Sequence, residues 1–136
     1  MRVILFLLSQ IAWALDSGSY SWLSHKTVLP VQVISYEWSN PEPDPLDLLT
    51  LASRLREASA DNCVIVVIGH SDSKTKSPDA NQRTSDRRAQ IVTDWIRRHL
   101  GYTSVVPLGR SDHDKLIEIQ GPEPRNRRCE VFVLPR

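Results

Sequence analysis

Charged side chains that could hold a ligand stand at two element boundaries of this 136-residue chain. Asp72 ends the sequence Gly-His-Ser-Asp directly after an apolar run, and Arg88 lies in a later segment with helical spacing. A carboxylate binds an ammonium group, and a planar guanidinium binds a carboxylate through two parallel hydrogen bonds. The two residues therefore suit a ligand that carries both charges, although Asp72 and Arg88 could instead pair with each other and fix the loop between them.

Four strand patterns and two helical patterns would position these residues. The strand patterns cover residues 31–36, 64–68, 104–108 and 127–134. The third contains Pro107, which favours a sheet edge, and the uninterrupted β-branched run at 64–68 is typical of a central strand. Asp72 follows that central strand, where ligands of open α/β sheets commonly bind.

The first helix is expected to begin at Asp44 as N-cap, with Pro45 at its first position, and the second is expected to end at Gly101. Apolar residues at helical spacing mark one face of each, at 48, 51, 52, 55 and 58 and at 89, 92, 95, 96 and 100. Asn81 and Ser85 could cap the start of the second helix. The order β-α-β-α-β-β predicts an α/β fold (an α+β sandwich) with a four-stranded mixed sheet and two main helices packed against it.

The first 14 residues have the layout of a secretory signal peptide. Arg2 precedes an apolar run over residues 3–11, and Ala12-Trp13-Ala14 forms a small-x-small cleavage site. A buried first strand is an alternative, whereas a membrane anchor would need about 20 apolar residues. We expect a signal peptide at 1–14, a linker at 15–29, one domain at 30–136, and no transmembrane span in the mature chain.

Composition restricts the partners and leaves the state of the cysteines open. The 17 basic and 16 acidic residues give a net charge of +1, so no global field attracts nucleic acid or an anionic membrane. The cluster at 125–128 also lacks interleaved aromatic residues, so no nucleic-acid partner is expected. Cys63 and Cys129 could lie close in the sheet and form a disulfide after export, or remain two buried thiols.

Three motifs, in order, resemble the OmpA-like family, whose usual pattern is G-H-T-D after a strand, N-x-x-L-S-x-x-R-A-x-x-V on a helix and N-R-R at the last strand. This chain has Gly69-His70-Ser71-Asp72, then Asn81, Ser85, Arg88, Ala89 and Val92, then Asn126-Arg127-Arg128. The resemblance covers residues 30–136. Thr84 stands where the family prefers Leu, and the loop at 73–80 lacks the usual Gly.

The resemblance implies non-covalent binding of peptidoglycan in the bacterial envelope, in the periplasm and associated with the cell wall or outer membrane. Asp72 would take the ammonium and Arg88 the carboxylate of the diaminopimelate end of the stem peptide, supported by Asn81, Arg127 and Arg128. Lys74 and Lys76 add positive charge beside Asp72, which either attracts a ligand carboxylate or disturbs the ammonium site. The domain would anchor an envelope complex and contact other envelope proteins. The alternative is an OmpA-like scaffold without peptidoglycan binding, in a secretion, conjugation or motor complex.

Two other chemistries compete with this function. Ser71, Asp72 and His70 include the residue types of a hydrolase, but consecutive residues of an extended segment point to opposite sides and no nucleophile elbow surrounds Ser71. The sequence Asp112-His113-Asp114, together with His70, could ligate a metal, although such a segment more often forms a solvated loop. We therefore expect neither an enzyme nor a metal or cofactor site.

Overall fold

The computed structural model describes residues 29–38, 40–74 and 77–135. The expected signal peptide and nearly all of the expected linker lie outside these residues. The elements follow the order β1 (Gln32–Ser35), α3 (Pro45–Glu57), β2 (Cys63–Gly69), α4 (Pro78–Trp95), β3 (Val105–Gly109) and β4 (Arg128–Pro135). This order confirms the predicted β-α-β-α-β-β fold.

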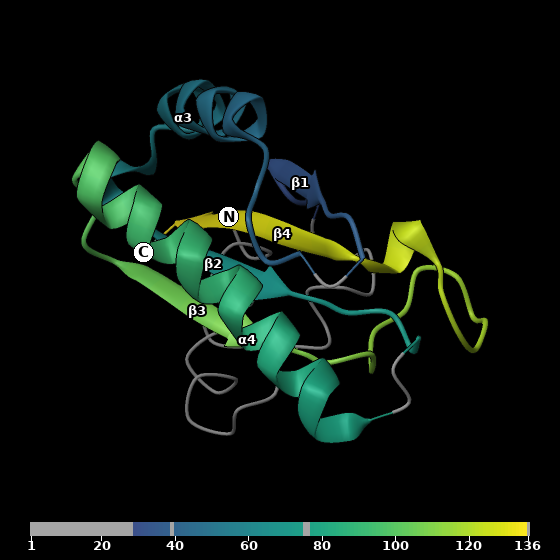
Figure 1. Ribbon diagram of the computed structural model, residues 1–136. Helices are drawn as coiled ribbons and strands as arrows, with labels where there is room; N and C mark the ends of the chain where they lie inside the picture. Colours follow the sequence, from purple (N-terminus) through teal and green to yellow (C-terminus); the bar gives the residue numbers. More distant parts are fainter. Residues whose placement is uncertain (1–28, 39, 75–76, 136) are drawn as a thin grey trace.

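The strands form one mixed sheet in the order β1-β4-β2-β3 (Figure 1). β4 is antiparallel to both of its neighbours, β1 and β2, whereas β3 is parallel to β2. Pro107 lies in β3 at the edge of the sheet, as predicted, where its missing N–H removes no ladder bond from a second neighbour. β2 is internal, which places its carboxyl end near the middle of the sheet.

Local capping determines where both helices begin. The Asp44 carboxylate accepts a hydrogen bond from the Leu46 N–H at 2.8 Å, and Pro45 occupies the first turn of α3, as predicted. α4 begins earlier than expected, because Ser77 is its N-cap and Pro78 its first residue. Asn81 therefore lies inside the first turn of α4, so the alternative that it caps the helix is wrong. Gly101 closes the helical segment with a φ of 77°.

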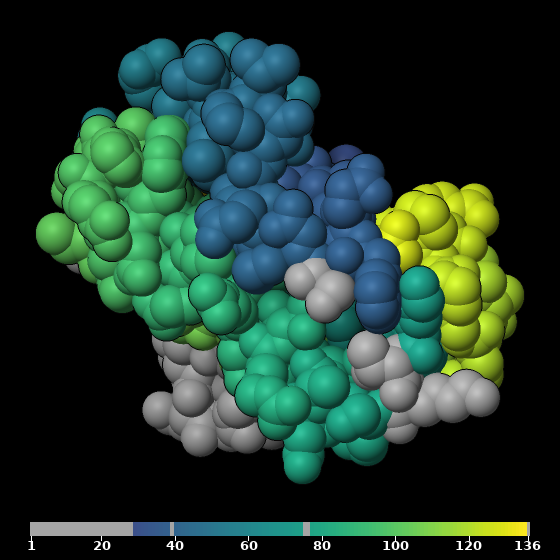
Figure 2. Space-filling view, viewed as in Figure 1, coloured from purple at the N-terminus to yellow at the C-terminus, as the bar shows by residue number. Residues whose placement is uncertain are grey.

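The core lies between the sheet and the helices. It contains buried apolar residues of both layers: Ile34, Leu51, Leu55, Ile65, Val67, Ala89, Val92, Ile96 and Val131. Trp95 and Leu100 of the predicted apolar stripe are only partly buried against this core. In the view of Figure 2, the segment that leads into α3 lies against the surface of α4. The helical layer and this segment together enclose the end of β2.

Gly69 allows α4 to pack directly on the carboxyl end of β2. A Cβ atom at this position would lie 2.1 Å from the Ser85 carbonyl oxygen and 3.0 Å from the Ala89 nitrogen. The middle of α4, including Arg88, therefore lies next to the segment that follows β2. This close approach brings Arg88 toward Asp72.

The two cysteines are free and far apart, which corrects the hypothesis that they lie close in the sheet. In the β2–β4 register Cys63 lies opposite Pro135, whereas Cys129 lies opposite Gly69, six residues further along β2. Six residues of strand span about 20 Å, far beyond the ~7 Å that a disulfide allows between Cα atoms. Cys129 belongs to the buried core, as the alternative of buried thiols predicted, and Cys63 is partly buried.

None of the helices among the described residues has the length and apolarity needed to cross a membrane.

Candidate functional site

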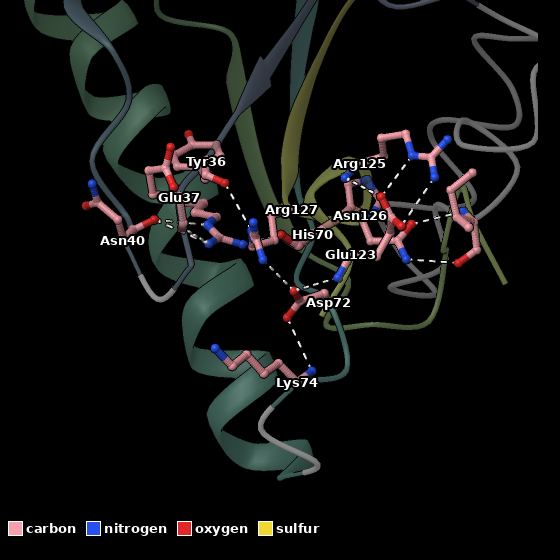
Figure 3. Close-up of polar contacts among 12 residues, drawn as sticks. Tyr36, Glu37, Asn40, His70, Asp72, Lys74, Glu123, Arg125, Asn126 and Arg127 are labelled. Carbon is pink, nitrogen blue, oxygen red and sulfur yellow. Dashed lines mark hydrogen bonds and ion pairs between the residues drawn. The ribbon is translucent and has the colours of Figure 1, made fainter. Parts of the chain in front are cut away.

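Asp72 lies just beyond β2, with its carboxylate buried and held by three protein donors (Figure 3). Its Oδ2 accepts a hydrogen bond from Arg127 Nη1 at 2.9 Å and one from the Glu123 backbone N–H at 3.1 Å. Its Oδ1 accepts from the Lys74 backbone N–H at 3.3 Å. A carboxylate offers about four acceptor positions, so these donors, counted among the described residues, leave about one for a ligand.

Arg127 holds Asp72 in place from the loop that precedes β4. Its Nε also donates to the Tyr36 carbonyl oxygen at 3.1 Å, so one guanidinium connects the end of β1 to the end of β2 (Figure 3). The Asp72–Arg127 ion pair is buried, with side-chain exposures of 5% and 10%. Asp72 thus forms its ion pair with Arg127, so the alternative that Asp72 and Arg88 pair with each other is wrong.

Arg88 projects from α4 into a cage of main-chain carbonyl groups. Its Nη1 donates to the His70 carbonyl at 2.7 Å, and its Nε and Nη2 donate to the Asn40 carbonyl at 3.3 Å. Nη2 also donates to the Glu37 carbonyl at 3.4 Å, and the guanidinium carbon lies 4.7 Å from the centre of the Tyr36 ring. Burial lowers the pKa of Arg88, since desolvation disfavours the charged form. A guanidinium has five N–H donors, so these four bonds leave about one for a ligand.

A small cavity of about 20 Å³ joins these groups, and its lining contains Asp72, Asn81, Arg88 and Arg127. A cavity needs roughly 10–15 Å³ to hold one water molecule, so this one has room for a single water or an ammonium-sized group. Four of the five residues predicted to bind the ligand therefore meet at one point. The chain supplies them from the end of β2, from α4 and from the loop before β4.

Arg128, the fifth predicted residue, lies elsewhere. Successive strand residues alternate between faces, and Cys129 belongs to the core beneath the helices, so Arg128 and Glu130 point to the opposite face. There Arg128 Nη2 donates to the Asp114 carbonyl at 2.9 Å and to Glu130 Oε1 at 3.2 Å. The alternation of strand residues predicts from the sequence that Arg127 and Arg128 point to opposite faces, without deciding which of them faces the site. The structure brings Arg127 to the cavity.

Trp38, Thr84 and Ser71 complete the wall of the cavity, and sequence reasoning did not assign Trp38. Trp38 is 47% exposed, and the Lys74 ammonium lies 3.7 Å from the centre of its indole ring. The sequence signal was weak because Trp38 follows the first strand in a segment without periodicity. Glu123 was missed as well, since its contact with Asp72 is made by a backbone N–H.

The residues of the two rival chemistries do not converge. His70 Nε2 lies 2.6 Å from Glu130 Oε1, while Asp72 is bonded to Arg127, so no Ser-His-Asp arrangement forms around Ser71. Burial lowers the pKa of His70 because desolvation disfavours its charged form, and the hydrogen bond to Glu130 opposes that effect. Within residues 29–38, 40–74 and 77–135, no group of three or more His, Cys, Asp or Glu residues could hold a metal ion.

Comparison with known proteins identifies the fold through solved structures. No family model and no curated protein sequence matches the chain. The peptidoglycan-associated lipoprotein from Burkholderia pseudomallei aligns with a TM-score of 0.65 and 14% identity, covering 75% of this chain and 89% of its own. The OmpA-like domain of FopA1 from Francisella tularensis aligns with a TM-score of 0.61 and 20% identity, covering 76% and 71%.

A third structure is more similar in sequence. The cell wall anchor of the T6SS from Pseudomonas aeruginosa aligns with a TM-score of 0.62 and 26% identity, covering 76% of this chain and 80% of its own. The structural neighbours are thus OmpA-like domains. The chain has the OmpA-like fold that its three motifs predicted.

Proposed function

We propose that this domain binds peptidoglycan non-covalently through the diaminopimelate end of the stem peptide, and anchors an envelope complex from the periplasm. The observation that carries the proposal is the cavity at which, counting the bonds of the described residues, Asp72 retains about one acceptor position and Arg88 about one N–H. Diaminopimelate presents an ammonium and a carboxylate side by side, and these two residues match them in charge. The fold shared with a peptidoglycan-associated lipoprotein and a cell wall anchor supports the same ligand.

Each residue has a distinct role in this proposal. Asp72 accepts from the ligand ammonium, and Arg88 donates to the ligand carboxylate. Arg127 fixes the Asp72 carboxylate, and Asn81 contributes a polar wall. Because carbonyl groups and the Tyr36 ring hold the Arg88 guanidinium in place, little side-chain entropy is lost when the ligand binds.

The cavity has room for the ligand ammonium alone, so the ligand carboxylate must meet Arg88 at the edge of the cavity and the remaining stem peptide must lie outside it. An open groove of about 720 Å³ runs past the other side of Arg127, and its lining includes Tyr36, Asn40 and Arg125. This groove offers space for the rest of the peptide. The ligand would thus insert its end between Asp72 and Arg88 and lie along the segment between β1 and α3.

The sharpest test is sedimentation of the full chain with purified sacculi. Loss of a charge-assisted hydrogen bond costs about 1.5–3 kcal/mol, so Asp72→Asn and Arg88→Lys should each weaken binding at least about tenfold. Both side chains also brace the fold, so the variants are expected to melt at lower temperature. Arg128→Lys is the matched control, because Arg128 is as buried as Arg88 but lies on the opposite face of the sheet.

Circular dichroism must show that each variant is folded at the temperature of the assay. Equal loss of binding in Arg88→Lys and Arg128→Lys would assign the effect to the fold and not to a contact with the ligand. Failure of the wild type to sediment with sacculi would contradict peptidoglycan binding itself.

The second candidate function is an OmpA-like scaffold that binds other envelope proteins and no peptidoglycan. One observation favours it: Asp72 and Arg88 already make most of the hydrogen bonds that they can make, all within the protein. In a pure scaffold these bonds would serve only to join β1, β2 and α4. Sacculus binding by the wild type separates the two functions directly.

A further inference from the structure

The indole of Trp38 forms an outer wall of the cavity and already holds a cation. The Lys74 ammonium lies 3.7 Å from the ring centre, and Trp38 is half exposed beside Asp72, Asn81 and Arg88. We propose that the ligand ammonium binds the face of the Trp38 indole in addition to Asp72, and that the Lys74 ammonium occupies this face when no ligand is bound. This inference rests on the proposed function and deepens it.

Asp72 alone is a weak ammonium site in this chain. Its buried neighbour Arg127 neutralises its charge at 2.9 Å, and the Glu123 and Lys74 backbone N–H groups take two further acceptor positions. An aromatic face attracts a cation through its quadrupole, without a buried charge of its own, and indole is the strongest such face among the side chains. An ammonium between Asp72 and Trp38 would therefore gain attraction that Asp72 by itself does not provide.

Lys74 shows that the geometry permits such a contact, and it also competes with the ligand. Its backbone N–H is bonded to Asp72, which keeps the start of its side chain beside the cavity. A tethered ammonium has a high effective concentration at the indole face, so the ligand ammonium must displace it. The two side chains should consequently act in opposite directions: Trp38 strengthens binding, and Lys74 weakens it.

The test is calorimetric titration of the full chain with a soluble tripeptide that carries a free diaminopimelate amine. A cation over an indole face changes affinity by roughly two- to thirtyfold, so Trp38→Leu should weaken binding within that range, and Trp38→Phe should weaken it less. Lys74→Gln should bind the tripeptide more tightly than the wild type. Trp95→Phe is the control for loss of a tryptophan, because Trp95 stacks on His99 and does not line the cavity.

A second ligand tests whether the positive charge of the diaminopimelate amine is responsible. When the diaminopimelate amine of the tripeptide is acetylated, wild type and Trp38→Leu should bind it equally, since no cation remains for the indole. Unchanged binding of the free-amine peptide by Trp38→Leu would overturn the proposal, and so would weaker binding by Lys74→Gln, which would mean that Lys74 contacts a ligand carboxylate.

The two proposals fail in different ways. If the wild type binds neither sacculi nor the tripeptide, peptidoglycan binding is wrong and the Trp38 subsite is wrong with it. If the wild type binds both and Trp38→Leu binds equally well, only the Trp38 subsite is wrong. Both Trp38 and Lys74 are exposed, so their variants are expected to keep the wild-type melting temperature.

Discussion

Two arginines of equal burial have different surroundings in this domain. Arg88 donates to three carbonyl groups from two segments of chain and reaches the cavity, whereas Arg128 bonds Glu130 and the Asp114 carbonyl on the opposite face. Both avoid the large cost of an unpaired buried charge. Only Arg88 lies where a ligand could complete its hydrogen bonds, so burial by itself does not mark a binding residue.

His70 should make stability depend on pH. Its folded pKa is lowered by burial, so below the ordinary histidine pKa of about 6.5 the unfolded chain takes up a proton that the folded chain excludes. The free energy of unfolding should therefore decrease as pH falls below about 6.5, by at most about 1.4 kcal/mol per pH unit. Urea unfolding at pH 7.5 and pH 5.5 measures this change.

Two variants test whether His70, and not another histidine, causes this pH dependence of stability. His70→Gln should lose most of the difference between the two pH values, whereas His113→Gln, which alters an exposed histidine, should retain it. The same pH dependence in wild type and His70→Gln would show that another group causes it.

At the scale of elements, the contact between α4 and β2 depends on Gly69. Gly69→Ala places a methyl group against the Ser85 carbonyl, and overpacking of this kind costs about 1–3 kcal/mol. We expect a loss of about 3 kcal/mol in urea unfolding, because the obstructing atoms belong to the backbone. The shift of α4 should also move Arg88 and weaken binding to sacculi.

Gly101→Ala is the matched comparison. This glycine has a φ of 77°, and no heavy atom of the described residues lies within 4 Å of an added Cβ, so the strain of an alanine here is that of the backbone conformation, at about 1–2 kcal/mol. The variant should be less stable but should bind sacculi normally. Equal binding by both glycine variants would mean that the position of α4 does not control the site.

Local signals predicted the elements better than they predicted the site. Asp44 and Pro45 act within one turn, so the start of α3 could be read from the sequence, and β2 was identified from its β-branched run. The strand pattern placed Arg127 and Arg128 on opposite faces but left open which one faces the site, since that depends on the register that pairs Gly69 with Cys129.

Local sequence signals could not predict contacts between loops that are distant in the chain. The bond from the Glu123 N–H to Asp72 joins positions 51 residues apart and involves no distinctive side chain. The cage around Arg88 likewise consists of carbonyl groups, which every residue possesses. Residue types could therefore predict Asp72 and Arg88 as a candidate site, but not that the protein itself would satisfy most of their hydrogen bonds.

At the scale of the whole molecule, the register of the sheet keeps the two thiols apart and buries them to different extents. Burial raises the pKa of Cys129, so it should resist alkylation in the folded protein, whereas Cys63 is only partly buried. Iodoacetamide without reductant should label Cys63 alone under native conditions and both cysteines in urea. Peptide mass spectrometry checks this outcome, and a Cys63–Cys129 disulfide peptide would contradict it.

The position of β4 between β1 and β2 also sets the order in which the protein can fold during synthesis. β2, α4 and β3 form a β-α-β unit that needs no later residues. Among the four described strands, however, β1 pairs with β4 alone, and β4 comes after the other three in the chain. Until the ribosome has made β4, the segment containing β1 has no partner in the sheet. The segment that contains β1 must therefore remain unpaired and open to chaperones until β4 emerges, although the β2-α4-β3 unit can form earlier.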